Sequence, residues 1–332
     1  MRAAHYPYSD GLQQGKSANG RVGQASGLTL ALVLTLDMPW PLLDADPDVE
    51  TFAIAKAIAD NIDKSRYRAN RFIYLPNGTY KVTGPIEGRV GTSGWSAGWR
   101  SMLLLMGESR SGTVIRLADN AEGYGDPAKP KWVVATGSEG DRKDNHGGGG
   151  NRAFRHAIMN LTVDVGRGNP GAIAIDFIAS NRGCVESVTV RAGEGSGRTG
   201  IAMTRHWPGP AMIEDVLIEG FDRGMHLDHY QYGMTFEDIT LRGQREIGIL
   251  NSNNMLAMRR IDFQGTVPFY RGGGGHSMLS LLDSRIVGGD NGAAITTGGF
   301  VNLRRCTFAG WQTVIDDTAK RNQDLAATAG AP

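Results

Sequence analysis

The sequence contains little cysteine and almost no net charge. Only Cys184 and Cys306 occur among 332 residues, which excludes a disulfide framework and predicts two free, buried thiols. The 35 basic and 34 acidic side chains nearly balance. Because no basic field is available to hold phosphates, nucleic acid is excluded as a partner.

The chain also lacks an apolar segment long enough to cross a bilayer. Gly27–Leu36 is an apolar run of ten residues, about half of what a membrane-spanning helix needs. We therefore expect no membrane partner. The run follows Lys16 and Arg21 and suits the core of a signal peptide, with a buried strand as the alternative. We interpret residues 1–44 as a signal-like N-terminal extension and expect an extracellular or periplasmic location.

Glycine is abundant, with 47 residues spread through the chain without a collagen-like triplet. Many tight turns are therefore expected. Gly147–Gly150 stand in a row inside the polar segment Thr136–Arg152, which we predict to be a mobile loop. No Lys-Ser or Lys-Thr pair follows these glycines, so they do not form a phosphate-binding loop.

Beyond this loop, an eight-residue strand pattern recurs seven times, with starts separated by 27, 28, 23, 22, 23 and 22 residues. The first, fourth and sixth positions are mostly apolar, the fifth is often threonine, and the eighth is glycine in five blocks. Such a coil can bury its apolar side only by stacking on its neighbours. The blocks are Ile158–Val165, Val185–Ala192, Ile213–Gly220, Phe236–Gly243, Met258–Gly265, Leu281–Gly288 and Leu303–Gly310.

A second short strand is visible between the blocks, as at Ala172–Phe177 and Gly224–Leu227. The pattern predicts an all-β fold, a right-handed parallel β-helix (solenoid) over residues 45–315, followed by a C-terminal tail at 316–332. A leucine-rich-repeat solenoid is the alternative, but its asparagine and fixed leucine spacing are missing.

Two further features precede the repeat. Asp48–Ser65 places Phe52, Ala55, Ile58 and Ile62 on one face, which predicts an amphipathic helix over residues 48–65 that covers one end of the β-helix. Strand-like runs follow it, at Arg71–Val82 and Ser101–Leu117.

Four segments resemble the pectate lyase superfamily of single-stranded β-helices, in particular the N-terminal β-helix of twin-β-helix exo-β-1,3-glucanases. They are Phe72–Val82, Leu103–Glu108, Gly112–Leu117 and Asn169–Ile175. The resemblance covers residues 45–315 and implies the β-helix with its capping helix. It leaves the reaction open, because this fold carries lyases, hydrolases, phage tailspikes and non-catalytic modules.

The sequence departs from that group in two places. Asp44–Thr51 stands where relatives have a Gly-Asp-Gly-x-x-Asp-Asp-Thr stretch. The glucanases also continue into a second β-helix, whereas this sequence ends at Pro332. The chain is thus either part of a longer protein with a second β-helix domain as partner, or a one-helix relative.

The candidate catalytic residues lie in and beside the third and fourth coils. Glycoside hydrolysis needs two carboxyl groups about 5–10 Å apart, and adjacent coils can pair Asp228 with Glu237 or Asp238. A lyase needs a base and a cation that neutralises the uronate carboxylate, and the candidates for the cation are Arg205, Arg223, His226 and His229. For Glu237, a solvated ladder of polar side chains in stacked coils is the structural alternative.

Candidate substrate-binding residues surround this set. Flat side chains stack on sugar rings and polar neighbours bind the hydroxyl groups. The histidines lack zinc-site spacing, so no metal site is predicted, although calcium held by Asp222 and Asp228 stays open. The paired aspartates and Gly-His-Gly of polygalacturonases are absent. The candidate binding residues are Trp207, Arg223, His229, Tyr230 and Tyr232.

These observations predict a carbohydrate-active β-helix that binds an extracellular polysaccharide or oligosaccharide. Glycoside hydrolase-like or polysaccharide lyase-like catalysis is the first hypothesis. A non-catalytic carbohydrate-binding module is the second, and a structural or adhesion β-helix is the third.

Overall fold

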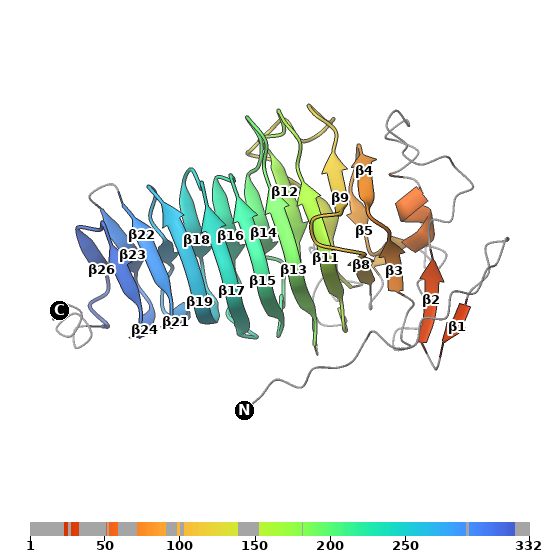
Figure 1. The fold of residues 1–332 in the computed structure, drawn as a ribbon. Coiled ribbons are helices and arrows are strands. Elements are labelled where there is room, and N and C mark those ends of the chain that lie inside the picture. The colour runs from red at the N-terminus through yellow and green to blue at the C-terminus, as the bar shows by residue number, and fades with distance from the viewer. Residues whose placement is uncertain are drawn as a thin grey trace.

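The computed structural model of the chain describes residues 23–25, 28–32, 51, 53–58, 72–90, 98–99, 103–138, 153–180, 182–289 and 292–322. Their strands stack along one axis into a parallel β-solenoid of about seven turns (Figure 1). The predicted right-handed parallel β-helix is thereby confirmed.

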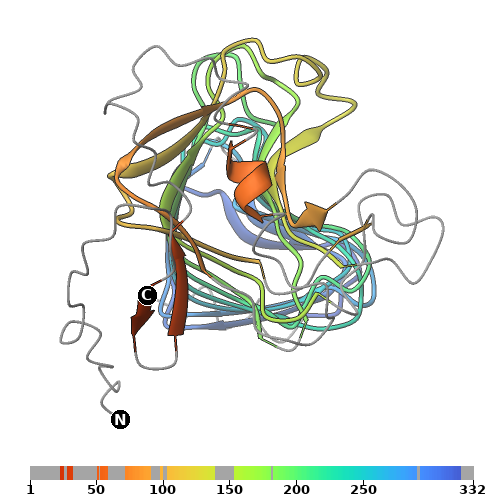
Figure 2. The same cartoon turned by 90° about the vertical axis from the view of Figure 1, so that its right-hand side faces the viewer.

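Two main sheets form the walls of the solenoid, and Figure 2 shows the successive coils superimposed around one interior. All pairs in them are parallel except β1 with β2. A small antiparallel pair joins β6 (Arg89–Val90) to β7 (Gly98–Trp99).

The fifteen-stranded sheet consists of β1 (Gly23–Ala25), β2 (Leu28–Leu32), β3 (Phe72–Leu75), β4 (Gly78–Val82), β8 (Leu104–Gly107), β9 (Thr113–Leu117), β11 (Ala157–Asp164), β13 (Cys184–Arg191), β15 (Met212–Glu219), β17 (Met234–Arg242), β19 (Met255–Gly265), β21 (Met278–Leu282), β22 (Arg285–Gly288), β24 (Phe300–Arg304) and β25 (Thr307–Ala309). The nine-stranded sheet consists of β5 (Ile86–Glu87), β10 (Lys131–Ala135), β12 (Ala172–Asp176), β14 (Thr199–Met203), β16 (Arg223–Leu227), β18 (Ile247–Asn251), β20 (Tyr270–Gly272), β23 (Ala293–Thr297) and β26 (Thr313–Asp317).

The strand register confirms the repeat residue by residue. First positions are partners in every neighbouring pair of coils, from Ile158 to Leu303. Sixth positions are partners in the same way, from Val163 to Phe308. Ile73 and Leu105 extend the first column upstream, so the two strand-like runs before the repeat are coils of the same solenoid.

The third position of each block has a backbone conformation that explains the burial pattern. All seven residues there have φ between 50° and 54°. A left-handed residue bends the strand and shifts its alternation by one residue. Positions one and four therefore both face inward, although strict alternation would place them on opposite faces. Ile213 and Val216, for example, are at most 1% exposed. The column contains Asn160, Ser187, Asp215, Asp238, Arg260, Asp283 and Arg305.

Glycine at the eighth position is confirmed as a turn residue in most coils. Gly220, Gly243, Gly288 and Gly310 have positive φ. At Gly288 the requirement is also one of space, because an added Cβ would lie 1.7 Å from the carbonyl oxygen of Gly265 in the preceding coil.

The capping helix is present, but its buried face differs from the prediction. Residues 51 and 53–58 are helical, and the rest of Asp48–Ser65 lies outside the described residues. Ile54, Ala57 and Ile58 are buried, whereas Ala55 is exposed. The buried face of the helix is therefore turned by about one residue from the predicted face.

Three smaller predictions are resolved in part. Cys184 and Cys306 are free, as predicted, but half-buried rather than buried. Leu28–Leu32 forms a strand, the alternative to a signal-peptide core. Most of the predicted loop Thr136–Arg152 lies outside the described residues.

No helix in the described part of the chain is long and apolar enough to cross a membrane.

His156 ties neighbouring coils together and is fully buried. Its Nδ1 accepts a hydrogen bond from the Leu103 N–H at 3.1 Å, and its Nε2 donates to the Gly137 carbonyl at 2.8 Å. Burial lowers its pKa to about 4. The side chain is therefore a neutral structural link at pH 7.

We predict that this histidine makes the fold acid-sensitive. Below its usual pKa of about 6.5 the unfolded chain takes up a proton, while the folded chain does not until about pH 4. Stability should therefore fall by about 3 kcal/mol between pH 6.5 and 4. Urea unfolding at pH 7 and 4.5 should show a smaller loss in His156→Gln than in the wild type. Equal losses in both proteins would contradict this role.

Candidate functional site

The structure separates the predicted site residues into two groups. One group lies on the strands of the nine-stranded sheet and at the turns that follow them, and contains His226 on β16, Asp228 and the predicted binding aromatics. The other group, Glu237 and Asp238, lies on β17 of the fifteen-stranded sheet. No hydrogen bond or ion pair connects Asp228 to either residue within the described ranges. The pairing of Asp228 with Glu237 or Asp238 therefore stays a prediction.

Five rings form a continuous chain across three coils, which we call the turn cluster: Trp207, His206, His229, Tyr230 and His276. Neighbouring centroids along this chain are 4.1, 4.3, 5.0 and 5.6 Å apart. Because such distances mean direct ring contact, loops separated by up to 70 residues present one aromatic surface.

The backbone of these turns is held in conformations that bulky residues rarely adopt. Trp207, His229 and Tyr232 have φ of 58°, 81° and 67°. Strained residues of this kind persist where surrounding contacts fix them, and they are concentrated at functional sites. Here the Trp207 indole N–H donates to Gln231, and Asn254 donates to the His229 carbonyl at 2.6 Å. Tyr230 and Tyr232 remain 49% and 45% exposed.

His226 faces outward from β16, between the buried Met225 and Leu227. Its Nε2 lies 3.3 Å from the Ser252 hydroxyl of the next coil. Burial, with help from the positive charge of Arg223, lowers the pKa of His226 to about 4. The imidazole is therefore neutral at pH 7 and able to accept a proton.

Asp228 follows two residues later, where the strand ends and the turn cluster begins. Its carboxylate accepts a hydrogen bond from the His229 N–H at 2.6 Å. Asp228 raises the pKa of both His226 and His229, and burial and other neighbours outweigh it in each case. A neutral base, a carboxylate and an aromatic surface thus meet at one turn.

Arg205 is engaged in the interior of the protein. Its Nε donates to Asp176 at 3.0 Å, its Nη2 donates to backbone carbonyls, and its guanidinium lies 5.5 Å from the Trp132 ring centroid. Both charged side chains are at most 8% exposed. Arg205 therefore supports the turn beneath the cluster and does not face a substrate.

Arg223 is more accessible. Among the described residues, its guanidinium makes one hydrogen bond, from Nε to Glu246 at the long distance of 3.4 Å. Asp222 is not free to bind calcium in this state, because Arg198 and Arg245 each donate to one of its carboxylate oxygens, at 3.1 and 2.9 Å.

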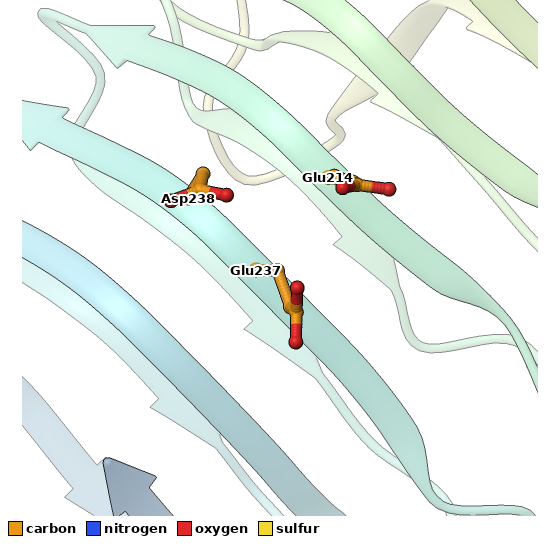
Figure 3. Close-up of side chains that lie close together, drawn as sticks. All are labelled: Glu214, Glu237 and Asp238. Atoms are coloured by element: carbon orange, nitrogen blue, oxygen red, sulfur yellow. The ribbon is translucent and has the colours of Figure 1, made fainter. Parts of the chain in front are cut away.

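The second group is a carboxylate cluster formed by Glu214, Glu237 and Asp238 on neighbouring strands (Figure 3). One oxygen from each lies within 4.8 Å of the others. Burial and the neighbouring carboxylates raise the pKa of Glu214. Arg260 donates to Glu237 at 2.9 Å and to both oxygens of Asp238, and lowers the pKa of Asp238. A guanidinium thus already compensates part of the charge that would attract a cation.

Two outward-facing residues in and beside the turn cluster were not predicted from the sequence. His276 belongs to the turn cluster, and it was not among the residues predicted for the site. Arg271 lies in the same outward row as His226, two strands away, through the register of Leu250. It is exposed and makes no ion pair with another described residue. Only the strand register, about 4.8 Å per step, could have shown this relation.

We predict that Arg205 stabilises the fold. Arg205→Met should lower the free energy of unfolding by about 3–5 kcal/mol, because Asp176 is left buried without its counter-charge. Arg191→Met is the control, since Arg191 pairs with Asp164 while 49% exposed and should cost less than about 1 kcal/mol. Denaturant unfolding measures both. Wild-type stability in Arg205→Met would contradict this assignment.

Comparison with known proteins identifies a family. A family model described as "Rhamnogalacturonase A/epimerase, pectate lyase-like" matches residues 44–268. No curated protein matches the chain. The predicted pectate lyase-like β-helix is thus confirmed, while the narrower resemblance to twin-β-helix glucanases stays a prediction.

Several solved structures are similar at low identity. ORF18 of Geobacillus virus E2 is 14% identical with a TM-score of 0.34, covering 79% of this chain and 58% of that one. The catalytic unit of an α-1,3-glucanase from Streptomyces thermodiastaticus is 12% identical with a TM-score of 0.36, covering 83% and 61%. The A-module of the mannuronan C-5 epimerase AlgE6 from Azotobacter vinelandii is 15% identical with a TM-score of 0.34, covering 79% and 91%.

The chain therefore spans about three fifths of the length of the first two structures. Its family is established by the sequence match, which covers more than half of the chain. The chain belongs to the rhamnogalacturonase A/epimerase family of pectate lyase-like proteins.

Proposed function

We propose that this chain is a carbohydrate-active enzyme that binds a polysaccharide at the turn cluster and uses His226 and Asp228 for proton transfer. One observation carries the proposal: the stacked rings lead directly to a neutral imidazole and a carboxylate at the end of β16. The names of the family's members, a rhamnogalacturonase and an epimerase, support a sugar polymer as substrate.

The turn cluster suits a sugar because its exposed Tyr230 and the neighbouring exposed Tyr232 offer flat apolar faces beside polar groups. Sugar rings place C–H groups on their faces and hydroxyl groups at their edges. Tyr230 and Tyr232 can stack on the faces, while Gln231 between them and Ser252 of the next coil offer polar groups. Such polymers occur outside the cytoplasm, so extracellular or periplasmic action is part of the proposal.

The chemistry that fits this turn is proton abstraction from a uronate sugar, as in a lyase. Neutral His226 takes the proton beside the uronate carboxylate, and the electron pair forms a C=C bond. The C–O bond to the next sugar breaks, and the departing oxygen takes a proton from solvent. Arg223 and Arg271 are the accessible cations that could neutralise the carboxylate. Return of a proton to the opposite face, with the C–O bond intact, would give epimerisation.

Glycoside hydrolysis at the carboxylate cluster is the second candidate. The raised pKa of Glu214, beside Asp238 whose pKa Arg260 lowers, separates an acid from a base as this reaction requires. It ranks second because Glu237 and Asp238 both bind Arg260, and no aromatic ring contact joins this cluster among the described residues.

We predict that His226→Gln and Asp228→Asn each reduce product formation at least about 100-fold. The assay uses rhamnogalacturonan, polygalacturonate, mannuronan and α-1,3-glucan, and measures ultraviolet absorbance of unsaturated uronates, reducing ends and epimer content by NMR. Arg285→Gln, an exposed pair with Asp262, is the control and should behave as wild type.

The products formed by the wild type and the variants distinguish between the lyase, the hydrolase and the binding module. Loss of activity in Glu214→Gln, with reducing ends but no unsaturated product, would replace the first candidate with hydrolysis. Binding without any product in the wild type would indicate a non-catalytic binding module.

We also predict an acidic limit to activity set by His226. As the pH falls through about 4, the imidazole becomes protonated and can no longer accept the substrate proton, so kcat/KM should fall about tenfold per pH unit below that point. A pH–rate profile measured between pH 3 and 8 checks this. A loss already centred near pH 6.5 would show that the base is a solvent-exposed histidine instead.

A further inference from the structure

An apolar row with exposed ends and a half-exposed middle residue runs along the solenoid beside the turn cluster. It consists of Met255, Met278 and Phe300, the first residues of β19, β21 and β24. The register places Met255 opposite Met278 and Met278 opposite Phe300. The three side chains therefore occupy the same position in three successive coils.

The row points outward, because the next residue in each strand points inward. Leu256, Leu279 and Val301 are at most 4% exposed. By contrast, Met255 and Phe300 are 43% and 49% exposed, which places them among the four large apolar side chains that stand out in the described part of the chain.

The other two exposed side chains are Tyr230 and Tyr232, and the row is continuous with them. Gly233 follows Tyr232, and a Cβ at Gly233 would lie 3.7 Å from the Met255 Cβ. His276, two residues before Met278, contacts the Tyr230 ring at 5.6 Å. The row and the two tyrosines thus lie next to each other, and we call them together the band.

The far end of the band has a cation. The Arg321 guanidinium lies 5.4 Å from the Phe300 ring centroid and close to the position of a Cβ on Gly275. Since Arg321 makes no ion pair with another described residue, it can donate hydrogen bonds to a ligand lying on Phe300.

We propose that the row binds further sugar units of the same polysaccharide chain, which extends along the solenoid axis from the turn cluster. This inference rests on the proposed function. Three strand steps from Gly233 to Phe300 span roughly 14 Å, and a sugar unit in an extended chain advances by close to one strand spacing. The enzyme then acts within polymers and favours fragments of at least four units over shorter ones.

The test compares binding of rhamnogalacturonan and mannuronan fragments of three and eight sugar units by calorimetry. In Met255→Ser/Phe300→Ser, the Kd of the eight-unit fragment should rise about tenfold, because two contacts of about 0.5–1.5 kcal/mol each are lost. The Kd of the three-unit fragment should not change. Leu217→Ser, a partly exposed apolar residue on the outer face of β15, is the matched control and should leave both values unchanged.

Each outcome separates this inference from the proposed function. If the wild type cleaves polysaccharide but the double variant keeps its preference for eight units, the row is not a sugar site and only this inference fails. If the length preference depends on the row but no product forms, the row stands and catalysis fails. A wild type that binds none of the fragments overturns both. A wild-type dimer that the double variant dissociates, seen by light scattering, would assign the row to a second copy of the chain.

Discussion

The structure depends on the stacking of coils in strict register. No single coil can bury its own apolar side chains, so each relies on the partner position of its neighbours. Register fixes which residue is the partner: Ile213 lies between Val185 and Phe236, and a slip by one residue would expose the whole apolar set. The left-handed residue at position three makes this arrangement possible, since it turns positions one, four and six toward one interior.

The same stacking divides the surface into regular and irregular parts. On the fifteen-stranded sheet, identical positions recur every coil, so charged residues meet in columns. Asp283 illustrates the result, because Arg259 and Arg305 donate to its two oxygens from the neighbouring coils at 3.0 and 2.5 Å. Such exposed pairs contribute little stability individually, but they compensate like charges that the register would otherwise align. The turns after the nine-stranded sheet have no such constraint, and their differing sequences supply the turn cluster.

Most of the fold could be predicted from the sequence, because register and burial are encoded as columns. Ile158 through Leu303 could be aligned by apolar character and spacing alone, and the structure pairs them in that order. The left-handed third column could not be predicted, since asparagine, serine, aspartate and arginine share no obvious signature there. The upstream coils at Ile73 and Leu105 were also not assigned to the repeat, because their spacing to Ile158 is interrupted by long insertions.

The site was only partly predictable, and the reason is geometric. The spacing of adjacent coils suggested Asp228 with Glu237, but it could not show that Asp228 follows β16 of the nine-stranded sheet while Glu237 lies on β17 of the fifteen-stranded sheet. Arg205 looked like an accessible cation, yet it pairs with Asp176, which lies 29 positions earlier in the sequence and one coil away in space. In a solenoid, the neighbours of a residue lie about 22–28 positions away in the chain. The residues of one site therefore come from neighbouring coils, and the strand register shows which residues are neighbours.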